Sequence, residues 1–395
     1  MDDYLSKQIL TYMGNKRKLI PHISNTLDIV IDEIINELLP ESGKEKKLVM
    51  ADAFSGTGIV SRLMKTKCQR LYSNDIAGYA RTLNECFLSN VNVKEEKQIL
   101  EMFKEANKFA YNSETDDIVP KWISRHWAPD IDIKKDQRTY FTPRNGLLID
   151  KYRFFINNYV SKKYQCYLLS SLLIESSIHN NTNGQFSAYF KDKNGIGKFG
   201  GENSIDINRI TQEIKLEMPT LYNNNCESIV SRLDVEEWLG TIPEVDIIYI
   251  DPPYNKHPYC IYYFMLDIIN DWDTSAVVPA TNRGQPKNWT VSDFNSYKHA
   301  EKAFVTMLDK IRAKYVMLSY NNKGIIPIAR LESILCSKGD VKVYPVKHNV
   351  YNRLKGLANY KKGEKETENV KECIWVLKMG GIKKNVKNNI YHNDK

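Results

Sequence analysis

An acidic residue followed by two prolines and a tyrosine, Asp251-Pro-Pro-Tyr254, is the segment of this sequence best suited to chemistry. It follows directly on the apolar run 245–250, which is typical of a buried strand. A carboxylate at the end of a parallel strand lies where open α/β sheets build their sites. The prolines fix the backbone and remove hydrogen-bond donors, so the local carbonyl groups are left as acceptors. The segment therefore predicts a site that presents acceptors at the tip of a strand.

Two neighbouring acceptors suit a reaction at an exocyclic amine, whose lone pair is delocalised into its ring. The Asp251 carboxylate and the Pro252 carbonyl would bind the two amine protons and stabilise the positive charge that develops on nitrogen. Tyr254 would stack on the face of a base taken out of a duplex. No strong general base is required, since the amine becomes more acidic once it is methylated. The alternative is an ordinary strand that ends at proline.

A second segment, Asp52-Ala-Phe-Ser-Gly-Thr-Gly58, lies between a predicted strand at 48–52 and a predicted helix at 59–65. Glycines at such a turn let a ligand approach the backbone closely. The segment lacks the Gly-Lys-Ser/Thr of a phosphate-binding loop. Asp75 follows the next predicted strand, 70–74, and would bind both ribose hydroxyls of an adenosine. Its alternative role is as the N-cap of a helix.

Together with Tyr12-Met-Gly-Asn-Lys16, these segments resemble the adenine-specific DNA methyltransferases of the Dam-like (alpha) class, and within it a restriction–modification branch. That class has an aromatic-x-Gly-x-Lys segment, then Phe-x-Gly-x-Gly, then Asp-Pro-Pro-Tyr, which is the order found here. Softer likenesses occur in four further stretches, at 140–146, 186–191, 255–263 and 319–321. The likeness covers most of residues 8–376.

The resemblance implies a methyl donor, S-adenosyl-L-methionine, a product, S-adenosyl-L-homocysteine, direct in-line transfer and no metal. The catalytic residues would be Asp251, Pro252, Pro253 and Tyr254. The cofactor would contact Tyr12, Lys16, Asp52, Phe54, Gly56, Gly58, Asp75, Asn225 and Asp251. Asn225 stands where the class often has an acidic residue that contacts the cofactor adenine, and Tyr12 stands where it often has Trp or Phe.

The alternation of predicted strands and helices around these motifs indicates an α/β fold. We expect a Rossmann-like methyltransferase sheet with helices on both faces, formed by residues 1–94 and 222–379. Residues 95–221 interrupt this alternation, and we expect them to form an inserted, mostly helical target-recognition domain that binds DNA. Residues 380–395 would be a basic C-terminal tail.

Outside the motifs, the hydrophobic pattern predicts a long helix over 19–39 that ends near Pro40. A short apolar run at 314–319 indicates another strand. The runs 342–345 and 373–378 are predicted to pair with each other at the far edge of the sheet.

Several polar residues are candidate DNA contacts. Arg138, Arg144 and Lys151 would bind phosphates, although each is equally well explained as a surface charge. The other candidates are Asn145, Tyr189, Lys191 and Asn321. Asn321 is also well explained by a turn after a strand.

The charge and cysteine content constrain the partners and the compartment. The net charge is +8, with the surplus concentrated after residue 341, which favours a polyanion such as double-stranded DNA. A lysine-rich surface encoded by an AT-rich genome would explain the charge equally well. The seven cysteines form no Cys-x-x-Cys pair, which argues against a zinc site or a disulfide framework. With no secretory pattern and no long apolar run, the sequence favours the cytoplasm of a prokaryote or a phage-infected host.

The expected function is site-specific methylation of adenine N6 in double-stranded DNA by a monomer, alongside a cognate restriction endonuclease that is not stably bound. N4 methylation of cytosine uses similar chemistry, but those enzymes more often carry Ser in place of Asp251. An RNA adenine methyltransferase is also compatible with the tetrapeptide. A catalytically inactive DNA-binding protein is disfavoured by the intact Asp251, Tyr254, Gly56 and Gly58. Carbon-5 methylation of cytosine needs a thiolate, which the tetrapeptide lacks.

Overall fold

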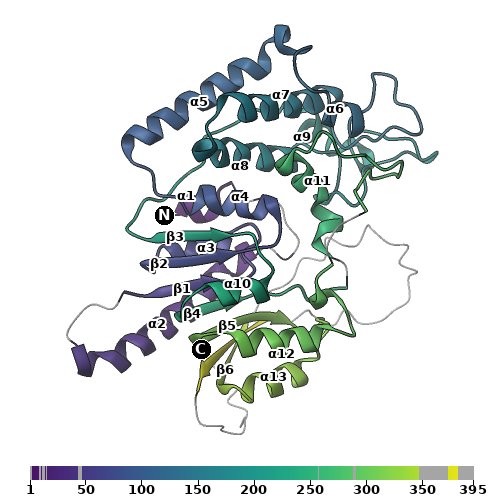
Figure 1. The fold of residues 1–395 in the computed structure, drawn as a ribbon. Coiled ribbons are helices and arrows are strands. Elements are labelled where there is room, and N and C mark those ends of the chain that lie inside the picture. Colours follow the sequence, from purple (N-terminus) through teal and green to yellow (C-terminus); the bar gives the residue numbers. More distant parts are fainter. Residues whose placement is uncertain are drawn as a thin grey trace.

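The computed structural model describes residues 2–8, 10, 14, 16–42, 47–256, 258–287, 291–346 and 372–380. Within these ranges, seven strands form one sheet in the order β3-β2-β1-β4-β5-β7-β6 (Figure 1). The strands run parallel except β7, which is antiparallel to both of its neighbours. The predicted α/β methyltransferase sheet is therefore confirmed.

The strands are β1 (Val49–Asp52), β2 (Arg70–Asn74), β3 (Glu227–Ser231), β4 (Val245–Ile250), β5 (Ala313–Asn321), β6 (Gly339–Val346) and β7 (Glu372–Met379). All of β4 is buried, as expected of a central parallel strand covered on both faces. β1 pairs with β4, with Asp52 opposite Tyr249, so the residues that follow these two strands lie at one edge of the sheet. The pairing of β6 with β7 confirms the predicted pair at the far edge.

Helices cover both faces of the sheet (Figure 1). One face carries α10 (Val235–Thr241), α12 (Ala300–Lys310) and α13 (Ile328–Cys336), which bury Trp238, Phe304 and Leu331. The other face carries α2 (Ile20–Ser42) and α3 (Ile59–Lys65). α2 continues past Pro40, where its end was predicted, because a proline near the last turn removes only one intrahelical hydrogen bond. The sheet is therefore enclosed between two apolar layers, one on each face.

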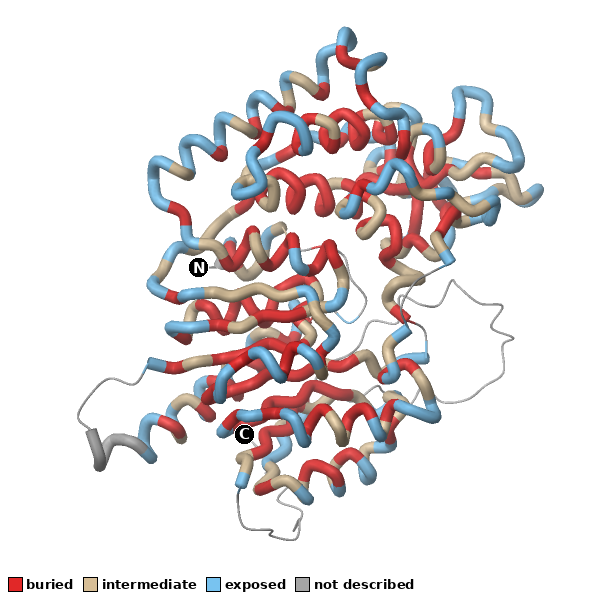
Figure 2. Tube along the Cα trace, in the orientation of Figure 1, coloured by how far each residue is buried: buried red, intermediate tan, exposed pale blue. Residues whose placement is uncertain are grey.

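A helical block extends beyond the β3 edge of the sheet (Figure 1). We use this name for the helices α5 (Val93–Tyr111), α6 (Ile123–His126), α7 (Pro143–Tyr159), α8 (Lys162–Ile178) and α9 (Ile207–Thr211). Buried residues run through the centre of the block (Figure 2) and continue without a break into α4 (Gly78–Phe87) and α11 (Tyr259–Asp271). The block thus shares its core with two helices outside residues 95–221, and the domain boundaries stay a prediction.

The remaining elements are short: α1 (Asp2–Ser6), and the 3-10 helices η1 (Lys16–Leu19), η2 (Ser113–Thr115), η3 (Glu202–Ser204) and η4 (Asp293–Asn295). Among the helices that the structure describes, none combines the length and the apolar character needed to cross a bilayer. Tyr12 and the predicted basic tail after residue 380 lie outside the described residues.

Candidate active site

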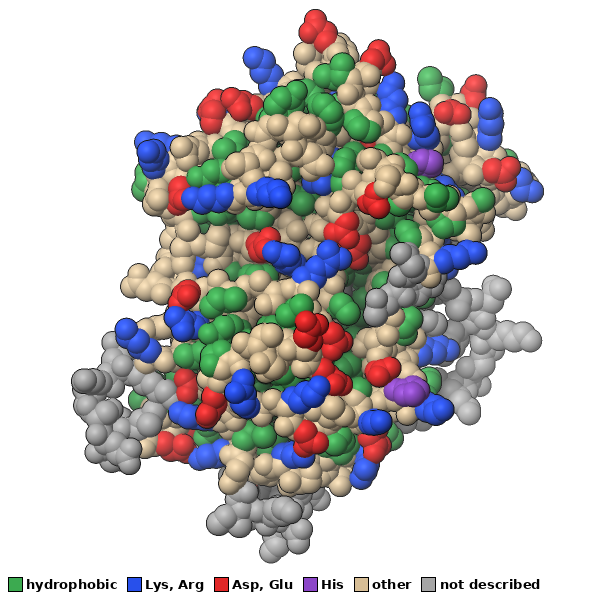
Figure 3. Space-filling view, viewed as in Figure 1, with side chains coloured by type: hydrophobic (Ala, Val, Ile, Leu, Met, Phe, Trp, Pro, Cys, Tyr) green, Lys and Arg blue, Asp and Glu red, His purple; other side chains and the backbone are tan. Residues whose placement is uncertain are grey.

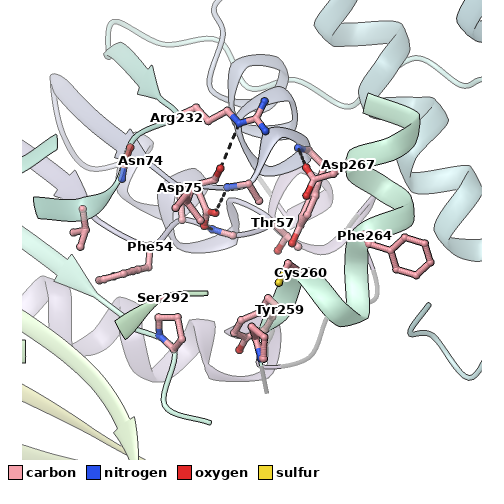
Figure 4. A pocket seen from close by; sticks show the side chains of 18 of the residues that line it. Phe54, Thr57, Asn74, Asp75, Arg232, Tyr259, Cys260, Phe264, Asp267 and Ser292 are labelled. Atoms are coloured by element: carbon pink, nitrogen blue, oxygen red, sulfur yellow. Dashed lines mark hydrogen bonds between the residues drawn. The ribbon is translucent and has the colours of Figure 1, made fainter. Parts of the chain in front are cut away.

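A cavity of about 570 Å³ lies at the carboxyl ends of the four strands β1 to β4. Its lining includes 52–57 after β1, 74–77 after β2, 232–235 after β3, and Asp251 after β4. The opposite wall is one face of α11, which supplies Tyr259, Cys260, Phe264, Asp267, Ile268 and Asp271 (Figure 4). The strand order reverses between β1 and β4, and open α/β sheets bind ligands at such a switch point.

The glycine segment after β1 is shaped by its backbone. Gly56 and Gly58 both adopt left-handed conformations, with φ of 50° and 83°. A Cβ on Gly58 would lie 2.6 Å from the Asn84 Oδ1 atom, so a larger residue would be both strained and crowded there. Gly56 lines the cavity, whereas Gly58 is not among its lining residues. Gly58 therefore supports the loop, and Gly56 is the glycine next to a ligand.

Asp75 ties the end of β2 to this loop. Its carboxylate accepts hydrogen bonds from the Gly56 amide at 2.8 Å and from the Ala77 amide at 2.9 Å. Burial raises the pKa of Asp75, while these backbone donors oppose the rise. Asp75 lines the cavity, as its predicted place beside a ligand requires, and it is not the N-cap of α4, because that cap is Ala77.

Asp52 is fully buried at the end of β1. Its Oδ2 atom accepts a hydrogen bond from Ser61 at 2.6 Å, but its Oδ1 atom has no hydrogen-bond partner in the described part of the chain. Burial raises the pKa of Asp52 to about 7, Ser61 lowers it, and the charges of Asp251 and Asp75 raise it further. A ligand donor would therefore find an open acceptor at this position.

Asp251 faces Lys16, which belongs to η1. The Lys16 Nζ atom lies 3.2 Å from Asp251 Oδ1 and 2.6 Å from Glu372 Oε1. Asp251 Oδ1 is thus ion-paired with Lys16, although it has no hydrogen-bond partner among the described residues. Burial raises the pKa of Asp251 to about 6 although Lys16 lowers it. Burial lowers the pKa of Lys16, but Asp251, Tyr254 and Glu372 outweigh it and raise the pKa well above its ordinary value.

The end of the tetrapeptide packs against β5 and the segment after it. Pro253 lines the cavity, while Pro252 is buried and Tyr254 is not among the lining residues. The Tyr254 ring meets Tyr320 edge-on at 5.4 Å, and the Tyr254 carbonyl accepts from the Ile325 amide at 3.0 Å. The Lys16 ammonium lies 5.5 Å from the centre of the Tyr254 ring. The stacking of Tyr254 on a base stays a prediction.

A third acceptor without a hydrogen-bond partner among the described residues belongs to Gln285, which lines the same cavity and was not predicted from the sequence. Its Nε2 atom donates to the Cys260 carbonyl at 2.8 Å. Because a carbonyl can only accept, the amide orientation is fixed and Oε1 is left without a partner among the described residues. An unpaired buried acceptor costs about 1–3 kcal/mol, so three of them around one cavity are typical of a ligand site.

The model of the D12 class N6 adenine-specific DNA methyltransferases matches residues 12–334. The chain belongs to this family. The match confirms the resemblance predicted from the order of the three motifs, and the adenine-specific class does not favour the cytosine alternative.

Named methyltransferases are similar along most of the chain. M.FokI, a Type II methyltransferase of Planomicrobium okeanokoites, is 26% identical over 351 residues, which cover 87% of this chain and 50% of M.FokI. M.NlaIII of Neisseria lactamica is 24% identical, covering 88% of this chain and 92% of M.NlaIII. M.CviAII of Paramecium bursaria Chlorella virus 1 is 23% identical, covering 85% and 91%. The chain thus spans about half the length of M.FokI and most of the other two.

One predicted cofactor contact of this D12 methyltransferase is misplaced. Asn225 is exposed and precedes β3, so it lies at the amino end of that strand, whereas the cavity lies at the carboxyl ends. The residues after β3 that do line the cavity include Arg232 and Asp234. Asp234 is an acidic residue that follows β3 and lines the cavity.

Arg138 was predicted to bind DNA, but its guanidinium is used inside the protein. It donates to the carbonyl groups of His126 at 2.9 Å, Pro279 at 2.7 Å and Thr281 at 2.8 Å. Burial lowers its pKa. Arg138 thus helps to fix the loop that carries Gln285, and its phosphate contact stays a prediction.

Three predicted DNA contacts are buried side chains, and their burial argues against those predictions. Asn145 is fully buried and accepts from the Ile214 amide at 3.0 Å. Lys151 is fully buried, with its ammonium 2.5 Å from an Asp116 carboxylate oxygen. Tyr189 has only 7% of its surface exposed. A side chain that is enclosed in the core cannot reach a phosphate or a base edge.

Three predicted DNA contacts remain near the surface. Arg144 forms an ion pair with Glu213 at 3.1 Å, and Asn321 accepts from the Lys323 amide at 2.9 Å, as expected of a turn. Lys191 is exposed, so its contact with DNA stays a prediction. On the face drawn in Figure 3, basic side chains are interspersed with acidic ones.

Proposed function

We propose that this chain transfers the methyl group of S-adenosyl-L-methionine to N6 of a specific adenine that is turned out of double-stranded DNA. The observation that carries the proposal is Asp251, a carboxylate with an open oxygen at the tip of β4, on the switch point of the sheet. Membership of the adenine-specific family supports the choice of base.

S-adenosyl-L-methionine fits the residues on the sheet side of the cavity. Its ammonium group would find the open Oδ1 of Asp52, and its ribose hydroxyls would find Asp75 beside Gly56. Asp234 at the rim would receive the adenine amino group of the cofactor. When bound, the cofactor supplies an electrophilic methyl group and its own leaving group.

The chain supplies geometry and acceptors for the target amine. Asp251 Oδ1 and the Pro252 carbonyl would bind the two amine protons and stabilise the positive charge on nitrogen as it is attacked. With a pKa of about 6, Asp251 is ionised at neutral pH and can accept a proton from the methylated amine. Lys16, whose pKa is raised well above its ordinary value, stays protonated and balances this charge.

The setting of the reaction is part of the proposal. Relatives named as Type II methyltransferases support a restriction–modification system, in which methylation protects a sequence from a cognate endonuclease. We expect the enzyme to act as a monomer, with residues 95–221 contributing the recognition of the DNA sequence.

Transfer of a radiolabelled methyl group tests the function. The protein is incubated with labelled S-adenosyl-L-methionine and unmethylated DNA, and the nucleosides are then separated. We expect label in N6-methyladenine, loss of label with Asp251→Ala, and full activity with Asp309→Ala, which removes an exposed carboxylate on α12. Label in N4-methylcytosine would show the wrong base, and no label with the wild-type protein would overturn the proposal.

A further inference from the structure

The Lys16 ammonium is held from two sides, by a residue of the reaction centre and by one from the far part of the sheet. The side chains of Lys16, Asp251 and Glu372 are 5%, 17% and 14% exposed, so water does not screen their charges fully. The Glu372 Oε1 atom that meets Lys16 also accepts from the Ser319 hydroxyl at 3.3 Å. Glu372 is thereby fixed in place independently of Asp251.

The antiparallel direction of β7 explains how Glu372 reaches the centre. Glu372 is the first residue of β7 and pairs with Asn321, the last residue of β5. A parallel strand in this position would place its first residue at the opposite edge of the sheet. Here the reversed strand brings a carboxylate to the edge where β4 delivers Asp251.

We propose that Glu372 is a positioning residue for methyl transfer, which takes the shorter contact of the Lys16 ammonium and so keeps its ion pair with Asp251 Oδ1 long. The inference rests on the function proposed above. The unequal distances support it, since Lys16 lies 2.6 Å from Glu372 and 3.2 Å from Asp251, and only the first contact is a hydrogen bond.

The charges around Lys16 show what the loss of Glu372 would do. The described groups that act on Lys16 include the carboxylates of Asp251 and Glu372 and the phenols of Tyr249, Tyr254 and Tyr259. Burial raises the pKa of all three phenols, so they stay neutral. Without Glu372, the ammonium would turn to Asp251, and a charge-assisted hydrogen bond there would compete with the incoming amine.

The contacts of Lys16 with Asp251 and Glu372 also predict how the methyl-transfer rate depends on pH. Lys16 lowers the pKa of Asp251 and Glu372 raises it, while Asp52 is a further carboxylate nearby. Because the reaction needs ionised Asp251, activity falls as the pH drops through its pKa. Glu372→Gln should therefore move this acid limb to lower pH, and Lys16→Gln should move it to higher pH.

The experiment measures single-turnover methyl transfer against pH for the wild type, Glu372→Gln, Lys16→Gln and the double variant. We expect Glu372→Gln to lower the rate by roughly tenfold to a hundredfold, as displaced catalytic groups do, with little change in the KM for S-adenosyl-L-methionine. The acid limbs should shift in opposite directions. The double variant should be no slower than Lys16→Gln, since Glu372 acts through Lys16.

Glu37→Gln is the matched control, because Glu37 pairs with Lys378 at the other end of the same strand. It should leave the rate and the pH profile unchanged. A wild-type rate and profile for Glu372→Gln, or additive losses in the double variant, would overturn the inference. If Glu372→Gln does not fold, Glu372→Asp tests the inference instead. This variant moves the carboxylate away from Lys16 by one methylene group. Unchanged turnover of Glu372→Asp would contradict a positioning role. Inactivity of the wild type itself would count against the proposed function instead.

Discussion

Two buried acid–base neighbourhoods, one in the helical block and one at the cavity, differ in how completely their polar atoms are paired. In the block, Asp150 accepts hydrogen bonds from the amides of Trp122, Ile123 and Ser124 and from the Ser124 hydroxyl. At the cavity, Asp251 keeps an oxygen without a hydrogen-bond partner among the described residues. The first arrangement fixes a loop onto a helix, and the second leaves an acceptor for a ligand.

The number of hydrogen bonds that a buried carboxylate accepts, more than its shifted pKa, distinguishes a structural carboxylate from a catalytic one. Burial raises the pKa of Asp150 to about 7 and that of Asp251 to about 6, so the shifts are similar. The lysines differ in the same way. Lys151 donates to the Asn112 carbonyl and to Asp116, whereas Lys16 reaches towards the open oxygen of Asp251.

The largest expected effect is that of Asp251→Asn on turnover. An amide keeps the shape but supplies a weaker acceptor and can turn a donor towards the amine, so we expect kcat to fall by about a hundredfold to a thousandfold. The thermal unfolding midpoint should change little, because Lys16 keeps its hydrogen bond to Glu372 when the charge of Asp251 is lost. Single-turnover methylation and a melting curve measure the two quantities. A variant with a lower unfolding midpoint and normal turnover would show that Asp251 is a structural carboxylate and not a catalytic one.

The matching change in the block, Asp150→Ala, should act on stability. It leaves three amides and a hydroxyl without their acceptor, so we expect a loss of about 3 kcal/mol in the free energy of unfolding. Turnover of the folded fraction should stay normal. Urea unfolding measures the loss, with Asp117→Ala, an exposed carboxylate in the same region, as control. Equal stability of the two variants would show that the paired carboxylate is not structural.

A smaller effect is expected for Asp75→Asn on the cofactor. The change removes the charge that faces the cavity, and we expect the KM for S-adenosyl-L-methionine to rise about tenfold, as for the loss of a hydrogen bond to a charged group. The KM for DNA should not change. Steady-state kinetics at varied cofactor concentration test this, and Asn225→Ala should leave the same constant unaltered. A higher KM for S-adenosyl-L-methionine with Asn225→Ala would show that Asn225 contacts the cofactor, contrary to its position in the structure.

The smallest effect is expected for Lys191→Ala on DNA affinity. The exposed ammonium would lose one phosphate contact, so affinity should fall a few-fold and the slope of log K against log salt should decrease by about 1. Arg144→Ala should change neither, because Arg144 already pairs with Glu213. Fluorescence anisotropy at several salt concentrations gives both numbers. Equal losses from the two variants would mean that paired cations of the block also bind DNA.

The sequence was a good guide wherever a strand end fixed the position of a residue. Asp52, Asp75 and Asp251 each follow a strand of the parallel sheet, and the sheet brings such residues together whatever the rest of the chain does. Asn225 was misplaced because the resemblance assigned the cofactor contact to a polar stretch that precedes β3, whereas the cavity lies at the other end of that strand.

The helical block resisted prediction for a physical reason. A long cationic side chain on a helix can turn inwards to a carbonyl group or outwards to solvent, and composition does not distinguish the two. Arg138 and Lys151 turn inwards because loops far away in sequence supply their acceptors. Glu372 was missed for a similar reason, since its partner Lys16 is 356 positions away and no local pattern links them.

This last contact has a consequence for biosynthesis. η1 is synthesised before β4, and β7 is the last strand of the described sheet, so a growing chain holds Lys16 and Asp251 before it holds Glu372. Contacts between such distant positions form late in folding. A chain that lacks β7 therefore has a lysine whose only nearby anionic partner among the described residues is Asp251, and the proposed fast methyl transfer requires the C-terminal strand of the sheet.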